Sequence, residues 1–291
     1  MKKNNFKRHI SIIARLIRVR LSLLVTFSAM TGFFLTGSSP TGSFILLLAG
    51  VFLLSAGTSV LNQVQECQHD ALMQRTKRRP IPAGEISFTE AWLLALVLIS
   101  AGTVLLGLNG WIPMALGLLN VVFYNLIYTP LKTRSWLAII PGAAVGSVPP
   151  LIGWTSAGFY VFHPNALFLA IFIFLWQIPH FWLLMIKYGK EYELAGFSSI
   201  TKILNIQQIK SVVFIWGIIT SVFLMLFPLF GFNLKPLLIV LLILLNLFFI
   251  RQFYRFLFLE RSSETIRKAF ILINSYAFTV FLLLMINAMI S

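Results

Sequence analysis

The sequence predicts an all-α, polytopic membrane protein whose nine transmembrane helices form one bundle, with the N-terminus in the cytoplasm. Hydrophobic residues make up 58% of the 291 residues, and charged residues only 11%. The mean hydropathy is +0.90. Several apolar segments reach or approach the roughly 20 residues that a helix needs to cross a bilayer. We therefore expect one transmembrane domain over residues 1–291 in place of separate soluble domains.

The hydrophobic runs define the nine predicted spans. Their approximate limits are 19–37, 43–63, 90–108, 111–129, 136–155, 166–186, 211–231, 234–250 and 269–290. The third and fourth spans are separated only by LNGW, which predicts a tight turn. The eighth span is the weakest, because the preceding FPLFGFNLKP leaves little room on its outer side. Eight spans is the alternative.

The charge distribution predicts the orientation. The net charge of +15 would suggest nucleic-acid binding in a soluble protein, but membrane proteins carry excess Lys and Arg on the cytoplasmic side. Along these spans, 22 of the 23 Lys and Arg residues fall on the side of the N-terminus, and only Lys235 falls on the other. All eight acidic residues share the N-terminal side. We expect a cell-membrane protein with its chemistry at the cytoplasmic face and no nucleic-acid partner.

The basic N-terminal segment has a second interpretation. MKKNNFKRHISIIARLIRVR contains no acidic residue and is also typical of a mitochondrial transit peptide. That alternative would place the protein in the mitochondrial inner membrane. The chain's one cysteine, Cys67, excludes an internal disulfide and a cysteine-based metal cluster.

The stretch NQVQECQHDALMQRTKRRP follows the second span. Asn62, Glu66 and Asp70 are spaced i, i+4, i+8 and share one helix face. Their oxygen atoms suit Mg²⁺, which usually takes one or two protein carboxylates together with substrate phosphates. The basic run from Arg75 to Arg79 could donate hydrogen bonds to those phosphates. The alternative is simple ion pairing at a helix end.

Two further polar segments lie on the same predicted face. In KYGKEYELAG, Glu191 follows Lys187 by four residues. It could supply a second metal ligand opposite the first acidic segment, or form only an i, i+4 ion pair. Tyr128 and Lys132 close the fourth span, where Lys132 could reach a diphosphate and Tyr128 could orient it or face a carbocation. The alternative is an interfacial tyrosine and an orientation signal.

A histidine and one small-residue pattern lie within predicted spans. His180 follows Pro179 in the sixth span, and a histidine at membrane depth is a functional candidate. It could ligate a metal such as haem iron, act as a base, or bond a neighbouring helix. Trp176 could form the wall of a binding site for a flat hydrophobic substrate, or it could only pack against its neighbours. The fifth span, with Gly142 and Gly146 and a Pro-Pro pair, indicates close helix approach and a cavity.

Taken in order, several motifs resemble a known family. These are N-x-x-x-E-x-x-x-D-A-L-M-Q-R-T-x-x-R-P, Y-T-P-L-K, G-W, P-H-F-W and E-Y-x-x-A-G-F. They resemble the UbiA superfamily of intramembrane prenyltransferases, and M-Q-R-T-x-x-R-P and P-H-F-W resemble its haem-farnesylating branch, the protohaem IX farnesyltransferases. The resemblance implies a UbiA-like bundle that transfers farnesyl from farnesyl diphosphate to a vinyl group of haem B, with Mg²⁺ as cofactor. It implies haem O as product and a haem A synthase as partner.

The resemblance also implies roles for individual residues. The metal ligands would be Asn62, Glu66, Asp70 and Glu191; the catalytic residues Asp70, Tyr128, Lys132 and His180; and the substrate-binding residues Asn62, Arg75, Arg79, Lys132, Trp176, Lys190 and Tyr192. The sequence departs from the family at Glu66, where Asp is usual, and at Gln63, Gln68 and Lys190. Because two of these changes remove expected carboxylates, the number of metal ions stays open.

Two other functions are compatible with the residues. A UbiA-type enzyme could prenylate a quinone-precursor aromatic instead of haem. A transporter or channel is the alternative outside enzymes, and it predicts inverted repeats and polar residues near the midplane of several helices. The polar residues here concentrate at one face, which favours an enzyme.

Overall fold

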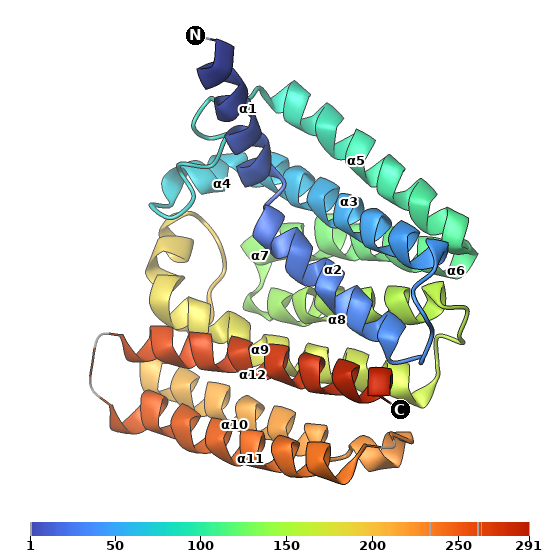
Figure 1. Cartoon of the computed structure of the whole chain (residues 1–291). Helices are drawn as coiled ribbons and strands as arrows, with labels where there is room; N and C mark the ends of the chain where they lie inside the picture. Colours follow the sequence, from blue (N-terminus) through green and yellow to red (C-terminus); the bar gives the residue numbers. More distant parts are fainter. Residues whose placement is uncertain (1, 233, 261, 263, 291) are drawn as a thin grey trace.

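The computed structural model describes residues 2–232, 234–260, 262 and 264–290, and every regular element within these ranges is a helix. In chain order the elements are α1 (Lys2–Leu16), α2 (Val19–Phe34), α3 (Gly42–Gln65), α4 (Cys67–Leu72), α5 (Phe88–Asn109), α6 (Trp111–Val121), η1 (Val122–Tyr128), α7 (Thr129–Arg134), η2 (Trp136–Ala138), α8 (Ile139–Ser156), α9 (Pro164–Leu194), η3 (Ile200–Lys202), α10 (Ile206–Leu224), η4 (Phe227–Phe230), α11 (Pro236–Tyr254), η5 (Arg255–Leu259) and α12 (Thr265–Ile290). Figure 1 shows the long helices lying side by side.

The predicted all-α membrane bundle is confirmed. Among the described residues, eight helices are long and apolar enough to cross a membrane, and the weakest predicted span is one of them, at Pro236–Leu259. The ninth apolar helix is α2, whose 16 residues rise about 24 Å, somewhat less than the roughly 30 Å of bilayer hydrocarbon. The predicted tight turn falls at Gly110, which adopts φ 140°. The cytoplasmic orientation of the N-terminus stays a prediction.

Helix starts follow local capping signals. Ser87 and Glu90 form a capping box that begins α5, and Asn205 and Gln208 form one that begins α10. The end of α9 differs from the sequence-based expectation, which placed a connection at 187–210. The helix continues to Leu194, because hydropathy marks only the apolar part of a helix and KYGKEYEL extends it as a polar helix.

Glycines bring α2 and α8 into backbone contact. A Cβ atom on Gly32 would lie 2.0 Å from the carbonyl oxygen of Pro150, and one on Gly153 would lie 1.8 Å from that of Ala29. No larger side chain fits at either position without moving the helices apart. This contact joins the N-terminal helices to the middle of the bundle.

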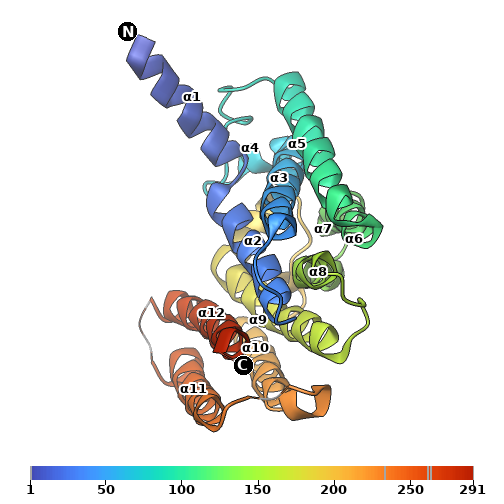
Figure 2. The same cartoon turned by 45° about the vertical axis from the view of Figure 1, so that its right-hand side comes forward.

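The buried core divides into a C-terminal and an N-terminal part. The larger apolar cluster joins α8 and α9 to α10, α11 and α12, while two smaller ones join α2, α3 and α5 with Ile152 of α8 and Leu16 of α1. A further small cluster of Met73, Ala195 and Phe197 joins the end of α4 to the segment after α9. Figure 2, viewed more nearly along the helices, shows α10–α12 on one side, α3, α5 and α6 on the other, and α2, α8 and α9 between them. The functional cavity lies between these two parts.

Candidate functional site

A cavity of about 450 Å³ lies inside the bundle. Its walls come from α2, α3, α4, α6, η1, α7, α8, α9 and α12, and none of the described residues of α5, α10 or α11 lines it. The charged lining residues come from α4, from the connection that follows it and from neighbouring helix ends, and they are Arg18, Glu66, Asp70, Arg75, Arg79 and Lys132. The helix middles contribute mostly apolar side chains, such as Val51, Leu54 and Phe281. The cavity therefore has a charged end and an apolar chamber.

The predicted acidic face is present at the charged end. Asn62 is in α3, Glu66 is the residue at which α3 ends, and Asp70 is in α4. The i→i+4 backbone bonds continue through the break, since Glu66 N–H donates to Asn62 O at 2.9 Å and Asp70 N–H donates to Glu66 O at 2.8 Å. The three side chains thus share one face, line the cavity and are buried.

Each of these side chains has a partner within the cavity. Glu66 forms an ion pair with Lys132, and Arg79 Nη1 donates to Asp70 Oδ2 at 2.5 Å. Asn62 Nδ2 donates to Thr129 Oγ1 at 3.1 Å. The charged end therefore holds compensated pairs of acids and bases.

Ion pairing keeps Glu66 charged. Burial alone would raise the pKa of Glu66, but the charge and hydrogen bond of Lys132, with the charges of Arg18 and Arg79, lower the pKa below its ordinary value. At neutral pH the side chain is a carboxylate. It can therefore act as a cation ligand as well as the partner of Lys132.

Arg18 belongs to this site, although the charge distribution predicted only a role in orienting the chain. It lies at the break between α1 and α2 and is the one described non-glycine residue with a left-handed φ, at 48°. Its side chain lines the cavity, and Nη2 donates to Asn62 Oδ1 at 3.1 Å. The neighbouring Arg15 instead pairs with Glu85 in an exposed position. A cluster of arginines in ARLIRVR was the one signal available, and it does not say which of them turns inward.

A π-helical segment presents Tyr128 and Tyr124 to the cavity. Both lie in η1, and their rings stack with centroids 5.6 Å apart. Lys132 Nζ lies 4.9 Å from the centroid of the Tyr128 ring. Gly142 makes room for that ring, because a Cβ atom there would lie 2.8 Å from it. π-helical turns occur frequently at functional sites.

The predicted small-residue pattern in α8, formed by Gly142 and Gly146, makes room for side chains and is not where α8 approaches another helix backbone. A Cβ atom on Gly146 would overlap the Gln177 side chain, with its amide nitrogen only 1.4 Å away. Gln177 itself lines the cavity. The two glycines admit Tyr128 and Gln177 to the cavity wall, and the backbone contact of α8 is made by other glycines.

The second acidic segment approaches the basic run of the first. Arg75 Nη2 donates to the Tyr192 hydroxyl oxygen at 2.8 Å, and Arg75 N–H donates to Glu191 Oε2 at 3.4 Å. Tyr192 and Arg75 line the cavity, whereas Glu191 does not, and Lys190 is exposed. The two acidic segments thus meet at the same end of the bundle.

The predicted metal ligands are not assembled as a closed cage. Three of them, Asn62, Glu66 and Asp70, line the cavity, and Glu191 contacts the backbone of Arg75. Within the part of the chain that the structure describes, no group of three His, Cys, Asp or Glu side chains is placed to hold a metal ion. The carboxylates described here therefore do not form a metal cage by themselves.

The segment after α9 closes one side of the charged end. His69 Nδ1 donates to Ala195 O at 2.6 Å, and its ring lies 4.8 Å from that of Phe197. Ser198 N–H donates to Lys132 O at 2.8 Å. We call residues 195–199 the strap. It is tied to α4 by His69 and to α7 by Ser198.

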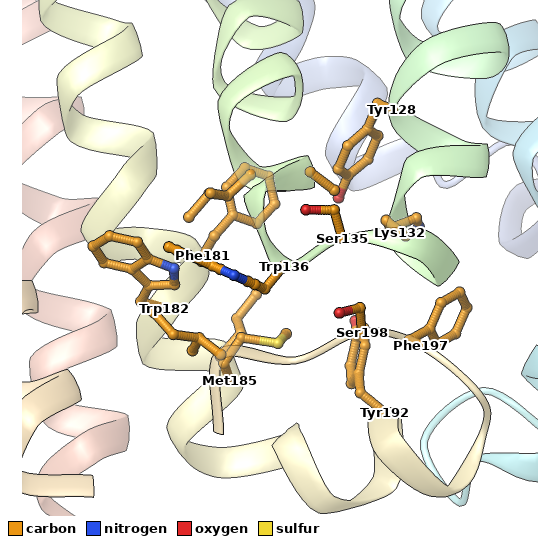
Figure 3. Close-up of a pocket in the computed structure, with 14 residues that line it drawn as sticks. Tyr128, Lys132, Ser135, Trp136, Phe181, Trp182, Met185, Tyr192, Phe197 and Ser198 are labelled. Atoms are coloured by element: carbon orange, nitrogen blue, oxygen red, sulfur yellow. The ribbon is translucent and has the colours of Figure 1, made fainter. Parts of the chain in front are cut away.

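A second pocket of about 90 Å³ lies beneath the strap. Figure 3 shows Tyr192, Phe197 and Ser198 facing Tyr128, Lys132 and Ser135, with the α9 side chains Phe181, Trp182 and Met185 on the other side. The pocket shares Tyr128, Lys132, Phe181, Tyr192 and Phe197 with the larger cavity. The two spaces therefore share a wall at the charged end.

His180 and Trp176 line the cavity on the α9 side. His180 Nδ1 lies 3.0 Å from Asn274 Oδ1, and Trp176 Nε1 donates to Ile273 O at 2.9 Å. Both side chains thus bond the neighbouring helix α12. This was one of the interpretations left open for His180, whereas the bond from Trp176 was not predicted. Asn274, which the sequence analysis did not single out, also lines the cavity.

Comparison with known proteins identifies similar sequences. Residues 24–282 match the UbiA prenyltransferase family. The chain is 41% identical over 186 residues to a protein named protoheme IX farnesyltransferase from Geobacter sulfurreducens, covering 64% of this chain and 69% of that protein. It is 38% identical to one of the same name from Cytophaga hutchinsonii, covering 62% and 64%. The matched region thus spans roughly two thirds of these relatives.

Solved structures share the fold at low sequence identity. One described as digeranylgeranylglyceryl phosphate synthase has a TM-score of 0.78 and 17% identity, covering 97% of this chain and 99% of that one. A UbiA homolog from Archaeoglobus fulgidus bound to GPP and Mg²⁺ has a TM-score of 0.67 and 15% identity, covering 93% and 99%. At these identities the likeness concerns the fold.

Proposed function

The chain belongs to the UbiA prenyltransferase family, and on this premise we propose that it transfers farnesyl from farnesyl diphosphate to a vinyl group of haem B, giving haem O. The observation that carries the proposal is the cavity with its two ends. Arg18, Arg75, Arg79 and Lys132 at one end suit a diphosphate, and the apolar chamber suits an isoprenoid and a porphyrin. The names of the similar proteins support haem as acceptor.

The donor set at the charged end fits magnesium. Asn62, Glu66 and Asp70 bring amide and carboxylate oxygens to one cavity, and Mg²⁺ is usually held by one or two carboxylates plus substrate phosphates. These three residues would hold the ion, while Glu191, which accepts from Arg75 N–H and does not line the cavity, stays a predicted ligand. When bound, Mg²⁺ neutralises charge on the diphosphate leaving group. The number of ions stays open.

The ion pairs at the charged end can rearrange when substrate arrives. Lys132 and Arg79 now face Glu66 and Asp70. A diphosphate offers both cations stronger anionic partners. If Lys132 and Arg79 turn to it, the two carboxylates become available as ligands. The paired charges would thus stabilise the charged end before substrate binds. Once it binds, the cations would hold the diphosphate and the carboxylates would be free to ligate Mg²⁺.

The reaction needs stabilisation of the leaving group and protection of the cation. As the allylic carbon–oxygen bond breaks, its electron pair leaves with the diphosphate, where Arg18, Arg79 and Lys132 stabilise the growing charge. The vinyl π electrons form the new carbon–carbon bond to the farnesyl cation. Water then adds to the resulting cation next to the porphyrin and loses a proton, which leaves the hydroxyl group. Tyr128 offers its ring face to a cation.

The haem would lie toward α9 and α12. Trp176 presents a flat aromatic wall there, and His180 presents an imidazole to the same cavity. Imidazole is a common ligand of haem iron. We assign His180 to the iron of the haem substrate and Trp176 to the porphyrin face.

Product analysis tests the proposed reaction. Purified protein in lipid nanodiscs is incubated with haem B, farnesyl diphosphate and Mg²⁺, and pigments are identified by mass spectrometry. We expect haem O, no product with excess EDTA, and at least about a 100-fold slower reaction in Asp70→Asn, the scale for losing one group that stabilises a transition state. A parallel incubation supplies a quinone-precursor aromatic in place of haem B. A prenylated product there, with no haem O in the first incubation, would favour the alternative acceptor instead.

The cellular setting is part of the proposal. The one-sided distribution of Lys and Arg supports a cytoplasmic charged end in a cell membrane. Haem O made in the bilayer would pass to an enzyme that oxidises it, and a haem A synthase is the partner of that chemistry. Co-purification with such an enzyme from native membranes would test the partnership.

A further inference from the structure

One polar contact in the apolar chamber is not used by the chemistry above. It joins His180 of α9 to Asn274 of α12, with His180 Nδ1 3.0 Å from Asn274 Oδ1. Both residues line the cavity. An ionisable or amide side chain at this depth is costly unless it is bonded. Hydrogen bonding therefore defines the orientation of the Asn274 amide and the tautomer of His180.

The orientation of the Asn274 amide follows from its second partner. Asn274 Nδ2 lies 2.5 Å from the backbone carbonyl oxygen of Phe270. A carbonyl oxygen only accepts, so the amino group must face Phe270 and the amide oxygen must face His180. An amide oxygen also only accepts, so His180 Nδ1 must carry the proton. In the neutral imidazole, Nε2 then holds the free lone pair.

The imidazole ring is also held by its neighbours. The Trp176 ring lies 5.0 Å from it, the Phe270 ring 4.8 Å and the Phe181 ring 5.6 Å, centroid to centroid. The bond from Trp176 Nε1 to Ile273 O, one residue before Asn274, fixes α9 against α12 beside it. The ring position and the tautomer are therefore both specified before any ligand binds.

We propose that Asn274 is a positioning residue, which holds His180 in the Nδ1-protonated tautomer so that Nε2 ligates the iron of the haem substrate. The inference rests on the proposed function for the identity of that substrate. Histidines that bind metals commonly donate their other N–H to an acceptor, which fixes the tautomer and raises ligand basicity. Asn274 has this relation to His180.

The test is a haem titration that does not depend on turnover. Wild type, Asn274→Leu and His180→Ala are purified in nanodiscs and titrated with ferric haem B alone, following the Soret band and the electron paramagnetic resonance spectrum. Loss of a partner that orients a metal ligand typically costs about 10–100-fold in affinity. We expect that loss in Asn274→Leu, together with weaker nitrogen ligation in the spectra, and a similar or larger loss in His180→Ala.

Two further variants separate this role from a general structural effect. Asn287→Leu replaces another buried amide of α12, which accepts from Lys235 N–H outside the cavity, and it should keep the wild-type haem spectrum. Asn274→Asp keeps an acceptor oxygen toward Nδ1 and should bind haem more like wild type than like the leucine variant. An aspartate variant as weak as leucine overturns the acceptor role, even if the leucine variant misfolds.

The outcomes also separate this inference from the proposed reaction. Wild-type affinity and spectra in Asn274→Leu, or in His180→Ala, overturn the positioning role whether or not haem O is made. A wild-type protein that shows the histidine-ligated spectrum and its loss in Asn274→Leu, yet forms no haem O, supports the inference and refutes the proposed transfer.

Discussion

At the scale of single residues, the backbone conformation of Arg18 predicts that glycine and alanine at this position differ in their effect on stability. Its left-handed conformation costs a non-glycine residue about 1–2 kcal/mol, while glycine adopts it freely. Arg20 is exposed within α2, where glycine is about 1 kcal/mol less favourable than alanine. We therefore expect Arg18→Gly to unfold at a higher temperature than Arg18→Ala, and Arg20→Gly at a lower temperature than Arg20→Ala.

Thermal unfolding of the four variants in detergent micelles measures both pairs. The same order of glycine and alanine at both positions would contradict the strained backbone at Arg18. Of these two arginines, Arg18 lines the cavity and Arg20 does not, so enzyme activity gives a second comparison. Both Arg18 variants should lose turnover, while both Arg20 variants should keep it.

The ion pair of Glu66 predicts how the stability of the fold depends on pH. Burial would raise its pKa, but Lys132, Arg18 and Arg79 lower it overall. A carboxyl group whose folded pKa lies below its unfolded value stabilises the fold above the unfolded pKa, and that stabilisation is lost as the pH falls through the folded pKa. Glu66→Gln should therefore lower the unfolding temperature most near neutral pH. The difference from wild type should shrink below about pH 4, and a difference that did not change with pH would refute the ion-pair account.

At the scale of elements, the sequence could predict the parts that the bilayer dictates. Hydropathy located the nine apolar helices found in the described part of the chain, and the i, i+4 spacing of Asn62, Glu66 and Asp70 survived the break between α3 and α4. Features set by distant contacts could not be predicted. The π-helical turn in VFYNLIY has no marker in its residues, and the partner of His180 lies 94 residues away in an apolar helix.

The contacts that His69 makes with the strap over the charged end predict an effect of this residue on substrate binding. His69 bonds Ala195, and its ring contacts that of Phe197, which lines the cavity. His69→Leu removes that bond, so the strap should open more often. We expect a higher KM for farnesyl diphosphate and faster proteolysis within 195–205, with a smaller change in kcat. Gln68→Leu alters the exposed neighbour in the same helix and serves as the control, and equal effects in both variants would argue against the strap.

At the scale of the whole molecule, the two-part core explains how a compact bundle can enclose a large cavity. The C-terminal cluster and the N-terminal clusters are each packed internally, so the space between them need not be filled for the fold to hold. Glycine contacts between α2 and α8 set one side of the gap. The bonds from α9 to α12 set another side. The cavity is thus a consequence of where the two parts meet.

The same arrangement predicts the orientation of the chain in the membrane. With the charged end in the cytoplasm, the connection before α3 must lie outside, because α3 crosses between them. Two single-cysteine proteins test this in a Cys67→Ser background. Gln68→Cys labels the charged end and Ser39→Cys the connection at 35–41, and both positions are exposed.

A maleimide that cannot cross membranes reports the side of each cysteine. We expect Gln68→Cys to react in inverted vesicles and Ser39→Cys to react in right-side-out vesicles, because 22 of the 23 Lys and Arg residues favour the first side as cytoplasmic. Detergent should make both react, which shows that neither cysteine is hidden within the fold. The opposite pattern would place the charged end outside the cell, away from cytoplasmic diphosphates, and the proposed substrate could then not reach it.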